Sequence, residues 1–269
     1  MPSPRLIAVA TTLALAGFCA MATAPAALAQ SSVHYVALGD SYSSGVGAGD
    51  YTSSSGSCDR STNAYSQLWA NANAPASYVS VACSGATTGS VISGQLSALS
   101  SATTLVSMTI GGNDVGFSST METCVLDSTS TCVSAIDADE NLVATQLPGE
   151  LNSVLGDIRT DAPSAQVVLL DYPELYDLSQ SSGCIGLSTT DRTDLNQAAD
   201  ELDSAIQAAA ARYSDTFKDI RSYFSGHEIC DSSPWLHSVN FLDVDESYHP
   251  TSSGQADAYY PAFSSVVKG

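Results

Sequence analysis

The sequence predicts an α/β protein built as a three-layer α/β/α sandwich, with helices on both faces of a central parallel β-sheet. Short apolar runs rich in β-branched residues alternate along the chain with longer segments of helical periodicity. Strands that are joined by helices pair in parallel through right-handed crossovers, and their carboxyl ends meet at one edge of the sheet. Several of these runs end directly in polar turns. We therefore expect one α/β domain with a ligand site along that edge.

Four apolar runs are predicted to form strands, and a fifth strand has two candidate positions. The four runs are residues 33–38, 78–82, 105–110 and 166–170. The fifth strand is expected at residues 217–220 or at residues 240–244. The first three strands lead into turns that contain Ser41, Gly85 and Asn113, so we expect these turns side by side.

Helices are predicted where apolar residues recur with a period near 3.6. The clearest segments are residues 63–71, 151–159, 191–213 and 252–267. Residues 45–61 are rich in Gly, Ser and Thr and are expected to form a loop. Residues 115–146 contain no clear strand, and long segments of this kind in a compact domain are usually functional. We expect them to be helical and to form one wall of the site.

The amino-terminal segment is typical of a secretory signal peptide. One positive charge, Arg5, precedes an apolar stretch that ends in Ala27-Leu28-Ala29, and this small-x-small pattern predicts cleavage after Ala29. A transmembrane helix is the competing interpretation, but Pro25 and the cleavage pattern argue against it. We therefore expect a signal peptide over residues 1–29, a single domain over residues 30–269, and a secreted, extracellular protein without an integral membrane segment.

The charge balance excludes several classes of partner. The chain has eight Lys and Arg residues, of which Arg5 lies in the predicted signal peptide, so seven remain against 28 Asp and Glu. Such an acidic protein is repelled by nucleic acid and by anionic membrane surfaces. We expect no nucleic-acid partner and a monomer.

Six cysteines remain after the predicted cleavage. They are Cys58, Cys83, Cys124, Cys132, Cys184 and Cys230. An even number in an exported chain favours three disulfides, although six cysteines allow 15 connectivities. Zinc is disfavoured because no C-x-x-C or paired-histidine pattern accompanies them, and we expect no metal or cofactor. Our working expectation is sequential pairing.

Ser41 is the candidate nucleophile, because Gly39-Asp40-Ser41 would hold its hydroxyl at the carboxyl end of the first strand. The alternative is that Ser41 only caps a helix. A serine nucleophile needs a base. Of the four histidines, His249 is the best placed, because Pro250 holds it in a turn ahead of the last helix. A His-Pro turn can also be purely structural.

Donors for an oxyanion form the third requirement of acyl transfer. The Gly85 backbone N–H has no side chain in its way, and Asn113 offers a side-chain amide, with the Ser41 N–H as a third donor. The alternative for Gly111-Gly112-Asn113-Asp114 is a tight turn with a left-handed asparagine. Asp40 and Asp114 are expected to be structural, accepting hydrogen bonds from turn N–H groups.

The four short motifs that contain these residues resemble the GDSL, or SGNH, hydrolase family. They are Gly39-Asp40-Ser41, Ser84-Gly85-Ala86-Thr87, Gly111-Gly112-Asn113-Asp114 and His249-Pro250, and they span nearly the whole mature chain in the family's order. The resemblance implies a flavodoxin-like sandwich with Ser41 and His249 as catalytic residues and Gly85 and Asn113 in the oxyanion hole. The six cysteines are similar to those of the family's extracellular bacterial lipase, esterase and phospholipase branch, whose disulfides join neighbours in sequence.

The chain departs from the family pattern at one position. The family usually has an aspartate three residues before the histidine, and this chain has Glu246 there. In some members of the extracellular branch a backbone carbonyl two residues before the histidine orients the ring, which corresponds to Ser247. Both remain candidates, and we favour a Ser41–His249 dyad oriented by the Ser247 carbonyl over a triad that includes Glu246.

The resemblance implies a secreted carboxylic ester hydrolase that acts on small-molecule or lipid-like esters through an acyl-enzyme. A carbohydrate acetyl esterase and an inactive, disulfide-stapled binding module are the alternatives. The acyl pocket is expected in residues 115–147 and in the loops of residues 172–187. Candidate pocket residues in those loops are Tyr172, Tyr176, Leu178, Ile185 and Leu187.

Overall fold

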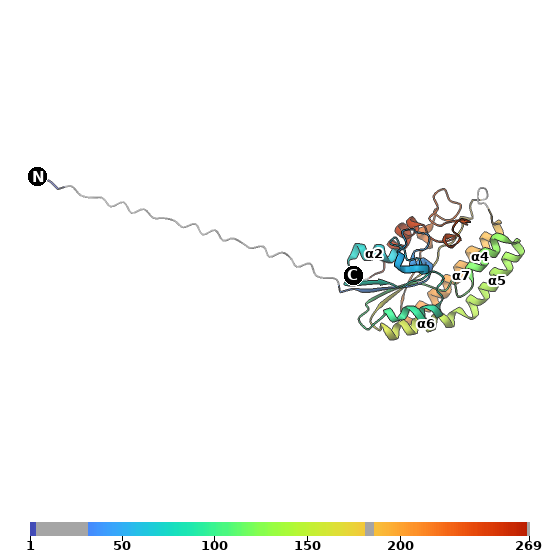
Figure 1. The fold of residues 1–269 in the computed structure, drawn as a ribbon, viewed down its shortest axis with the longest axis horizontal. Coiled ribbons are helices and arrows are strands. Elements are labelled where there is room, and N and C mark those ends of the chain that lie inside the picture. The colour runs from blue at the N-terminus through green and yellow to red at the C-terminus, as the bar shows by residue number, and fades with distance from the viewer. Residues whose placement is uncertain (4–31, 181–185, 268–269) are drawn as a thin grey trace. The chain divides into compact units, whose positions relative to one another are not determined.

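The computed structural model describes residues 1–3, 32–180 and 186–267, and within residues 32–267 it shows a parallel sheet of five strands (Figure 1). The strands lie in the order β2-β1-β3-β4-β5. Their bounds are β1 His34–Gly39, β2 Ser77–Ser80, β3 Leu105–Thr109, β4 Gln166–Leu170 and β5 Thr216–Lys218. The first strand, β1, lies inside the sheet. Strand β2 pairs with one side of β1 and forms one edge, and β3, β4 and β5 follow in order on the other side of β1.

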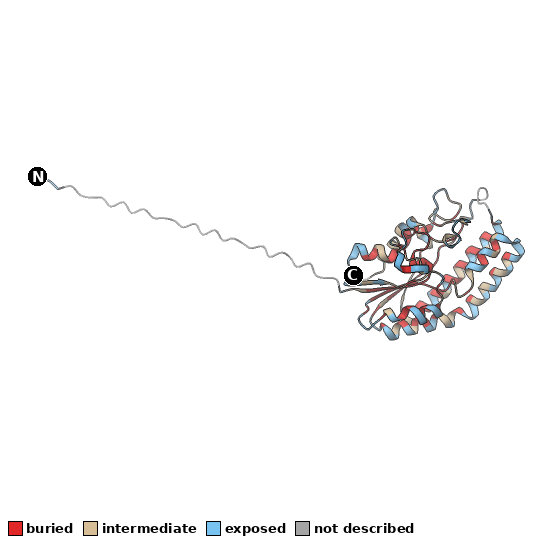
Figure 2. Ribbon diagram, in the orientation of Figure 1, coloured by how far each residue is buried: buried red, intermediate tan, exposed pale blue. Residues whose placement is uncertain are grey.

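The central strands are buried on both faces, which explains why their sequences are continuous apolar runs. In β3 all five residues are buried, and in β4 the last four are. Edge strands β2 and β5 are shorter and only partly covered. Figure 2 shows buried residues along the strands and on the sheet-facing sides of the helices.

Two groups of helices cover the two faces of the sheet (Figure 1). One group consists of α4 Phe117–Leu126, α5 Thr129–Thr145, α6 Leu147–Asp161 and α7 Thr189–Tyr213. The other consists of α2 Tyr65–Asn73, α8 Arg221–Phe224, the π-helical segment Gly254–Tyr259 and α9 Tyr260–Ser264. Two single turns, α1 Ser41–Ser44 and α3 Thr88–Ser90, follow β1 and β2. The predicted α/β/α sandwich is therefore correct.

The remaining turns are short. They are the 3₁₀ segments Ser53–Cys58, Leu96–Ala98 and Val244–Glu246 and the π-helical segment Val91–Gln95. The described residues contain no helix that is both long and apolar enough to cross a bilayer.

Four strands were predicted within three residues of their bounds, whereas one alternative for the fifth was wrong. Residues 216–218 pair with β4, so residues 217–220 marked the right place. Residues 240–244 instead form a surface turn in which Leu242 and Val244 are exposed. Their backbone bonds are local instead, since the Asp243 N–H donates to the Asn240 carbonyl and the Glu246 N–H donates to the Asp243 carbonyl.

The predicted helices were correct in position, with three differences. The segment 115–146 forms two helices, α4 and α5, separated by Ser128, whose hydroxyl accepts a hydrogen bond from the Thr131 N–H. The helix of residues 151–159 starts earlier, at Leu147, because Pro148 suits a first helical turn. The C-terminal helix contains a π-helical stretch, Gly254–Tyr259, after its first two residues.

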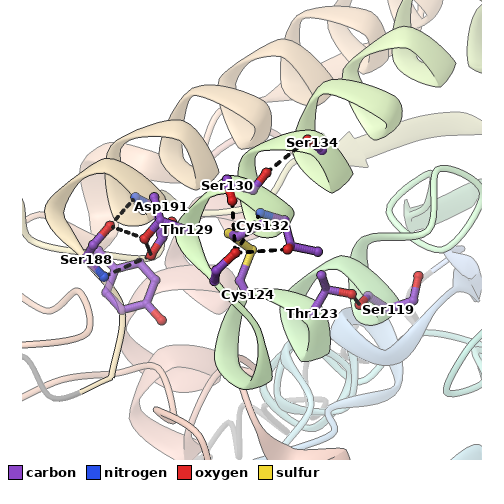
Figure 3. Close-up of a disulfide and its surroundings, with 12 residues drawn as sticks. Ser119, Thr123, Cys124, Thr129, Ser130, Cys132, Ser134, Ser188 and Asp191 are labelled. Atoms are coloured by element: carbon purple, nitrogen blue, oxygen red, sulfur yellow. Dashed lines mark hydrogen bonds between the residues drawn. A yellow bond between two sulfur atoms is a disulfide. The ribbon is translucent and has the colours of Figure 1, made fainter.

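Two disulfides join neighbouring cysteines, Cys58 to Cys83 and Cys124 to Cys132. The second one closes the turn between α4 and α5 (Figure 3). Beside it the Thr129 hydroxyl donates to Ser188 and Asp191 at the start of α7, so the turn is also held to a neighbouring helix. The predicted partner of Cys230, Cys184, lies outside the described residues, and that pair stays a prediction.

Candidate active site

Ser41 lies in the first turn of α1, directly behind β1. Gly39, at the end of β1, lets the backbone pass close to Thr109 of β3. Its φ of +117° is unfavourable for other residues, and an added Cβ would lie 2.4 Å from the Thr109 carbonyl oxygen. The residue that caps the helix is Asp40, whose carboxylate accepts a hydrogen bond from the Tyr42 N–H at 3.1 Å. The interpretation of Ser41 as a helix cap is therefore wrong. Its own N–H lies in the first turn, where backbone donors have no partner within the helix.

Asp40 is buried and accepts two further hydrogen bonds, from the Thr109 hydroxyl at 2.6 Å and from the Tyr172 hydroxyl. Burial raises the pKa of Asp40 to about 6, although its three donors oppose that shift. The Tyr172 hydroxyl also accepts a hydrogen bond from the Gly112 N–H at 3.3 Å. Tyr172 thus connects the turn that carries Ser41 with the turn that carries Asn113.

His249 is in hydrogen-bond contact with Ser41. Its Nε2 lies 2.7 Å from Ser41 Oγ, and its Nδ1 lies 3.0 Å from the Ser247 carbonyl oxygen. Burial lowers the pKa of His249 to about 4, against the opposing effect of the Ser247 carbonyl. The ring is therefore neutral at pH 7. Its Nδ1–H donates to the carbonyl, which leaves Nε2 free to accept the Ser41 hydroxyl proton.

Of the two candidate orienters, the Ser247 carbonyl contacts His249 and the Glu246 carboxylate bonds elsewhere. Glu246 Oε1 accepts a hydrogen bond from the Tyr51 hydroxyl at 2.8 Å. Tyr51 in turn accepts one from the Gly47 N–H at 2.8 Å. Glu246 therefore fastens the loop after α1 to the turn ahead of His249.

Tyr42 stabilises the turn that carries His249. The Tyr42 hydroxyl donates to the Tyr248 carbonyl at 2.6 Å, and Tyr248 has a left-handed φ of +65°. The Tyr42 ring lies 5.2 Å from the His249 ring, centroid to centroid. The residue after the candidate nucleophile therefore packs against the candidate base and fixes its turn.

The other three histidines have different partners within the described residues. His34 Nδ1 lies 2.8 Å from Ser77 Oγ, and His237 Nε2 lies 2.8 Å from the Gly47 carbonyl. His227 stacks on Trp235 with ring centroids 3.6 Å apart. Neither His227 nor His237 is bonded to Ser41 there.

Gly85 and Asn113 line the same cavity as Ser41 and His249. Gly85 has a φ of +73°, and an added Cβ would meet nothing within 4 Å, so its backbone faces open space. The Asn113 amide donates one hydrogen bond to the Ala86 carbonyl at 3.0 Å, which leaves its second N–H for another acceptor. Asp114 accepts bonds from the N–H and the hydroxyl of Thr88, so it has the expected structural role.

The cavity has a volume of about 580 Å³ and is lined mainly by apolar side chains. One wall is α4, through Phe117, Met121, Val125 and Leu126. The opposite wall comes from Tyr172, Leu175 and Leu202 and from the segment of residues 239–248. Among the described residues that line it, the charged groups are Asp40, Glu122 and Asp245, and none is a lysine or arginine. The same described residues contain no group of metal ligands.

The sequence profile of the GDSL-like lipase/acylhydrolase family matches residues 37–256. The chain belongs to this family. It is 52% identical over 266 residues to Lipase 1 of Streptomyces coelicolor, with 98% of both chains covered. It is 47% identical over 255 residues to a lipase of Streptomyces rimosus, with 95% of this chain and 93% of the relative covered.

Solved structures of similar chains have the same fold. Phospholipase A1 from Streptomyces albidoflavus NA297 superposes with a TM-score of 0.85 and 50% identity, covering 87% of this chain and 98% of that one. An acetylxylan esterase from Geobacillus stearothermophilus superposes with a TM-score of 0.51 and 15% identity over 87% of this chain and 93% of that one. At that identity the second likeness concerns the fold alone.

The predicted walls of this GDSL-like protein's cavity were partly correct. Residues 115–147 contribute α4 as expected, and Tyr172 lines the cavity. Tyr176, Leu178 and Leu187 do not line it: Tyr176 and Leu187 are buried, the Tyr176 hydroxyl donates to the Tyr248 hydroxyl, and Leu178 is exposed. Ile185 lies outside the described residues.

Sequence reasoning missed the wall formed by Val239, Phe241 and Val244. Phe241 and Val244 lie in residues 240–244, one of the two predicted positions of the fifth strand, and Val239 directly precedes them. The available signal was a set of large apolar residues in a polar stretch just before His249.

Proposed function

We propose that this enzyme hydrolyses carboxylic esters through a Ser41–His249 dyad. The observation that carries the proposal is the 2.7 Å contact between His249 Nε2 and Ser41 Oγ at the floor of an apolar cavity. His249 accepts the Ser41 proton as Oγ attacks the ester carbonyl, and the protonated ring then donates that proton to the leaving alcohol. Water attacks the resulting acyl-enzyme with His249 again as the base.

Three donors are assigned to the oxyanion in this proposal. They are the N–H groups of Ser41 and Gly85 and the side-chain amide of Asn113, and the support for this assignment is that all three residues line the same cavity. The Ser247 carbonyl fixes the tautomer of His249 and accepts the Nδ1–H throughout the cycle. Since that carbonyl is uncharged, the developing imidazolium has no carboxylate beside it, in contrast to a Ser-His-Asp triad.

The substrate class that fits is a lipid-like ester. A cavity of about 580 Å³ lies in the middle of the range of about 300–1,000 Å³ that holds ligands of drug size, so it is far larger than an acetyl group needs. Its apolar lining suits an acyl chain, and relatives at 47–52% identity are named lipases.

The test is turnover of p-nitrophenyl esters from acetyl to palmitoyl, beside phosphatidylcholine and acetylated xylan. We expect long-chain esters to be favoured over acetyl esters, and Ser41→Ala and His249→Ala to lose activity by a factor on the order of 10⁴–10⁶. Full activity in either variant would overturn the dyad. Preference for acetylated xylan would overturn the substrate class and favour a carbohydrate esterase.

We also propose that residues 1–29 are a signal peptide, that residues 30–269 are the secreted domain, and that it acts as a monomer with no nucleic-acid partner. A further disulfide between Cys184 and Cys230 would complete the three-disulfide pattern of the extracellular branch. Mass spectrometry of the protein from culture medium tests the cleavage site and the pairing together. Sedimentation velocity tests the monomer.

A further inference from the structure

Large apolar side chains are concentrated at the mouth of the cavity. Leu126, Phe241, Leu242 and Val244 are 66%, 75%, 99% and 68% exposed. Within the described part of the domain the other exposed large hydrophobics, such as Val79 at 42%, are far less accessible. Three of the four line the cavity, and Leu242 directly follows one of them, Phe241. We call these four residues the apolar rim.

Residues 240–247, which include three of the four residues of the apolar rim, form a turn that is held by hydrogen bonds. The Asn240 side-chain oxygen accepts a hydrogen bond from the Leu242 N–H at 3.1 Å, and the Asn240 N–H donates to Ser247 Oγ at 2.9 Å. The Asp243 N–H donates to the Asn240 carbonyl at 3.2 Å. These bonds hold three apolar side chains in water, where each gains free energy when an apolar phase covers it.

The charges around the apolar rim indicate what can cover it. Glu122, Asp243, Asp245 and Glu246 flank it or lie within it, and no lysine or arginine of the described chain lines the cavity. In a two-fold dimer through this surface, the carboxylates of one copy would face those of the other. An anionic lipid surface would be repelled in the same way. A zwitterionic lipid surface carries no net charge and has cationic groups at its outer edge.

We propose that the apolar rim docks the enzyme on the surface of zwitterionic lipid aggregates, so that an ester enters the cavity directly from the lipid. This rests on the proposed function. Phe241 and Leu242 enter the boundary between headgroups and acyl chains, and the neighbouring carboxylates stay at the level of the headgroups. The lipid surface therefore meets the enzyme at the mouth of the cavity, next to the cavity wall that α4 forms.

The test uses vesicles that the enzyme cannot hydrolyse, made of phosphatidylcholine with two ether-linked chains. Co-sedimentation is measured for the wild type, for Leu242→Ser and for the control Val79→Ser. Leu242 is suitable because it does not line the cavity, and Val79 is an exposed apolar residue on the edge strand β2. Turnover of a soluble butyrate ester is measured for the same proteins.

We expect Leu242→Ser to weaken binding about ten-fold, as the loss of one buried leucine side chain requires. Val79→Ser should bind as the wild type does, and all three should turn over the soluble ester equally. Mixing in anionic ether lipid should weaken wild-type binding at low salt.

Wild-type binding by Leu242→Ser, or stronger binding to the anionic vesicles, would overturn the docking surface. So would a dimer in sedimentation velocity that Leu242→Ser dissociates without a change in vesicle binding. Failure of the wild type on the soluble ester would overturn the proposed function instead, and the two results are read from separate assays.

Discussion

Replacing Glu246 with glutamine separates the two ways in which His249 could be oriented. In the structure the Glu246 carboxylate accepts a hydrogen bond from the Tyr51 hydroxyl, and His249 Nδ1 lies 3.0 Å from the Ser247 carbonyl oxygen. Glutamine keeps a side-chain oxygen at the same position, so the bond from Tyr51 survives and only the negative charge is lost.

The expected magnitudes differ by several orders. If Glu246 oriented the imidazole, as the aspartate of a triad does, replacing its carboxylate with the glutamine amide would lower kcat by a factor of about 10⁴. If it only fastens the Tyr51 loop, the substitution changes free energies by about 0.5 kcal/mol or less, which is roughly a factor of two in rate. The structure predicts the second result.

The assay is kcat and kcat/KM on a soluble p-nitrophenyl ester, with the melting temperature measured on the same samples. Tyr51→Phe is the matched control, because it removes the hydroxyl that bonds Glu246 and leaves the carboxylate in place. A fall of 10²-fold or more in kcat for Glu246→Gln, without a fall for Tyr51→Phe, would show that the carboxylate acts on His249 and would refute the dyad.

Four further predictions follow from the described contacts. By NMR, the His249 ring should titrate near pH 4 because burial lowers its pKa, and a titration near 6.5 would contradict that cause. Asn113→Ala should lower kcat by about 10²–10³ with little change in KM, measured on the soluble ester; an unchanged kcat would exclude it from the oxyanion hole. Joint replacement of Cys58 and Cys83 by alanine should lower the free energy of unfolding by about 3.5 kcal/mol in urea, since their loop spans 25 residues. Asp171, at the end of β4, is buried and accepts a hydrogen bond from the Ile220 N–H at 2.8 Å. Burial raises its pKa to about 8, so the free energy of unfolding in urea should fall as the pH rises from about 4 to about 8, and Asp171→Asn should flatten this slope; parallel slopes would contradict it.

The strands of this fold were predictable because each central strand is covered on both faces and so consists of a continuous apolar run. The same logic failed at residues 240–244, where an apolar run lines a cavity mouth. Periodicity records that a side chain avoids water, but it does not distinguish a neighbouring strand from a substrate. Strand β5, with only three half-buried residues, gave a correspondingly weak signal.

The residues that the structure brings together at the cavity were predictable from their positions after strands and from the family pattern. Most of the contacts that hold them were not. Tyr172 and Asp40 are 132 residues apart, and nothing local marks a tyrosine hydroxyl that will meet a buried carboxylate. The Ser247 carbonyl has no signal in residue type, because every residue has a carbonyl, and it became the favoured candidate only through the family resemblance. Glu246 was the less favoured candidate, and its carboxylate bonds Tyr51.

The bond between Ser41 and His249 joins residues 208 positions apart, and this has a consequence for how the site comes into being. Synthesis produces the serine first and the histidine 208 residues later. The sheet strands between them pair in parallel, so each pairing waits for a complete crossover. A nascent chain made only as far as β5 already contains every strand of the described sheet and the turn that carries Ser41, but it lacks the proposed base. In the proposed mechanism, ester hydrolysis therefore begins only after the segment that carries His249 has been made and has folded back onto the turn that carries Ser41.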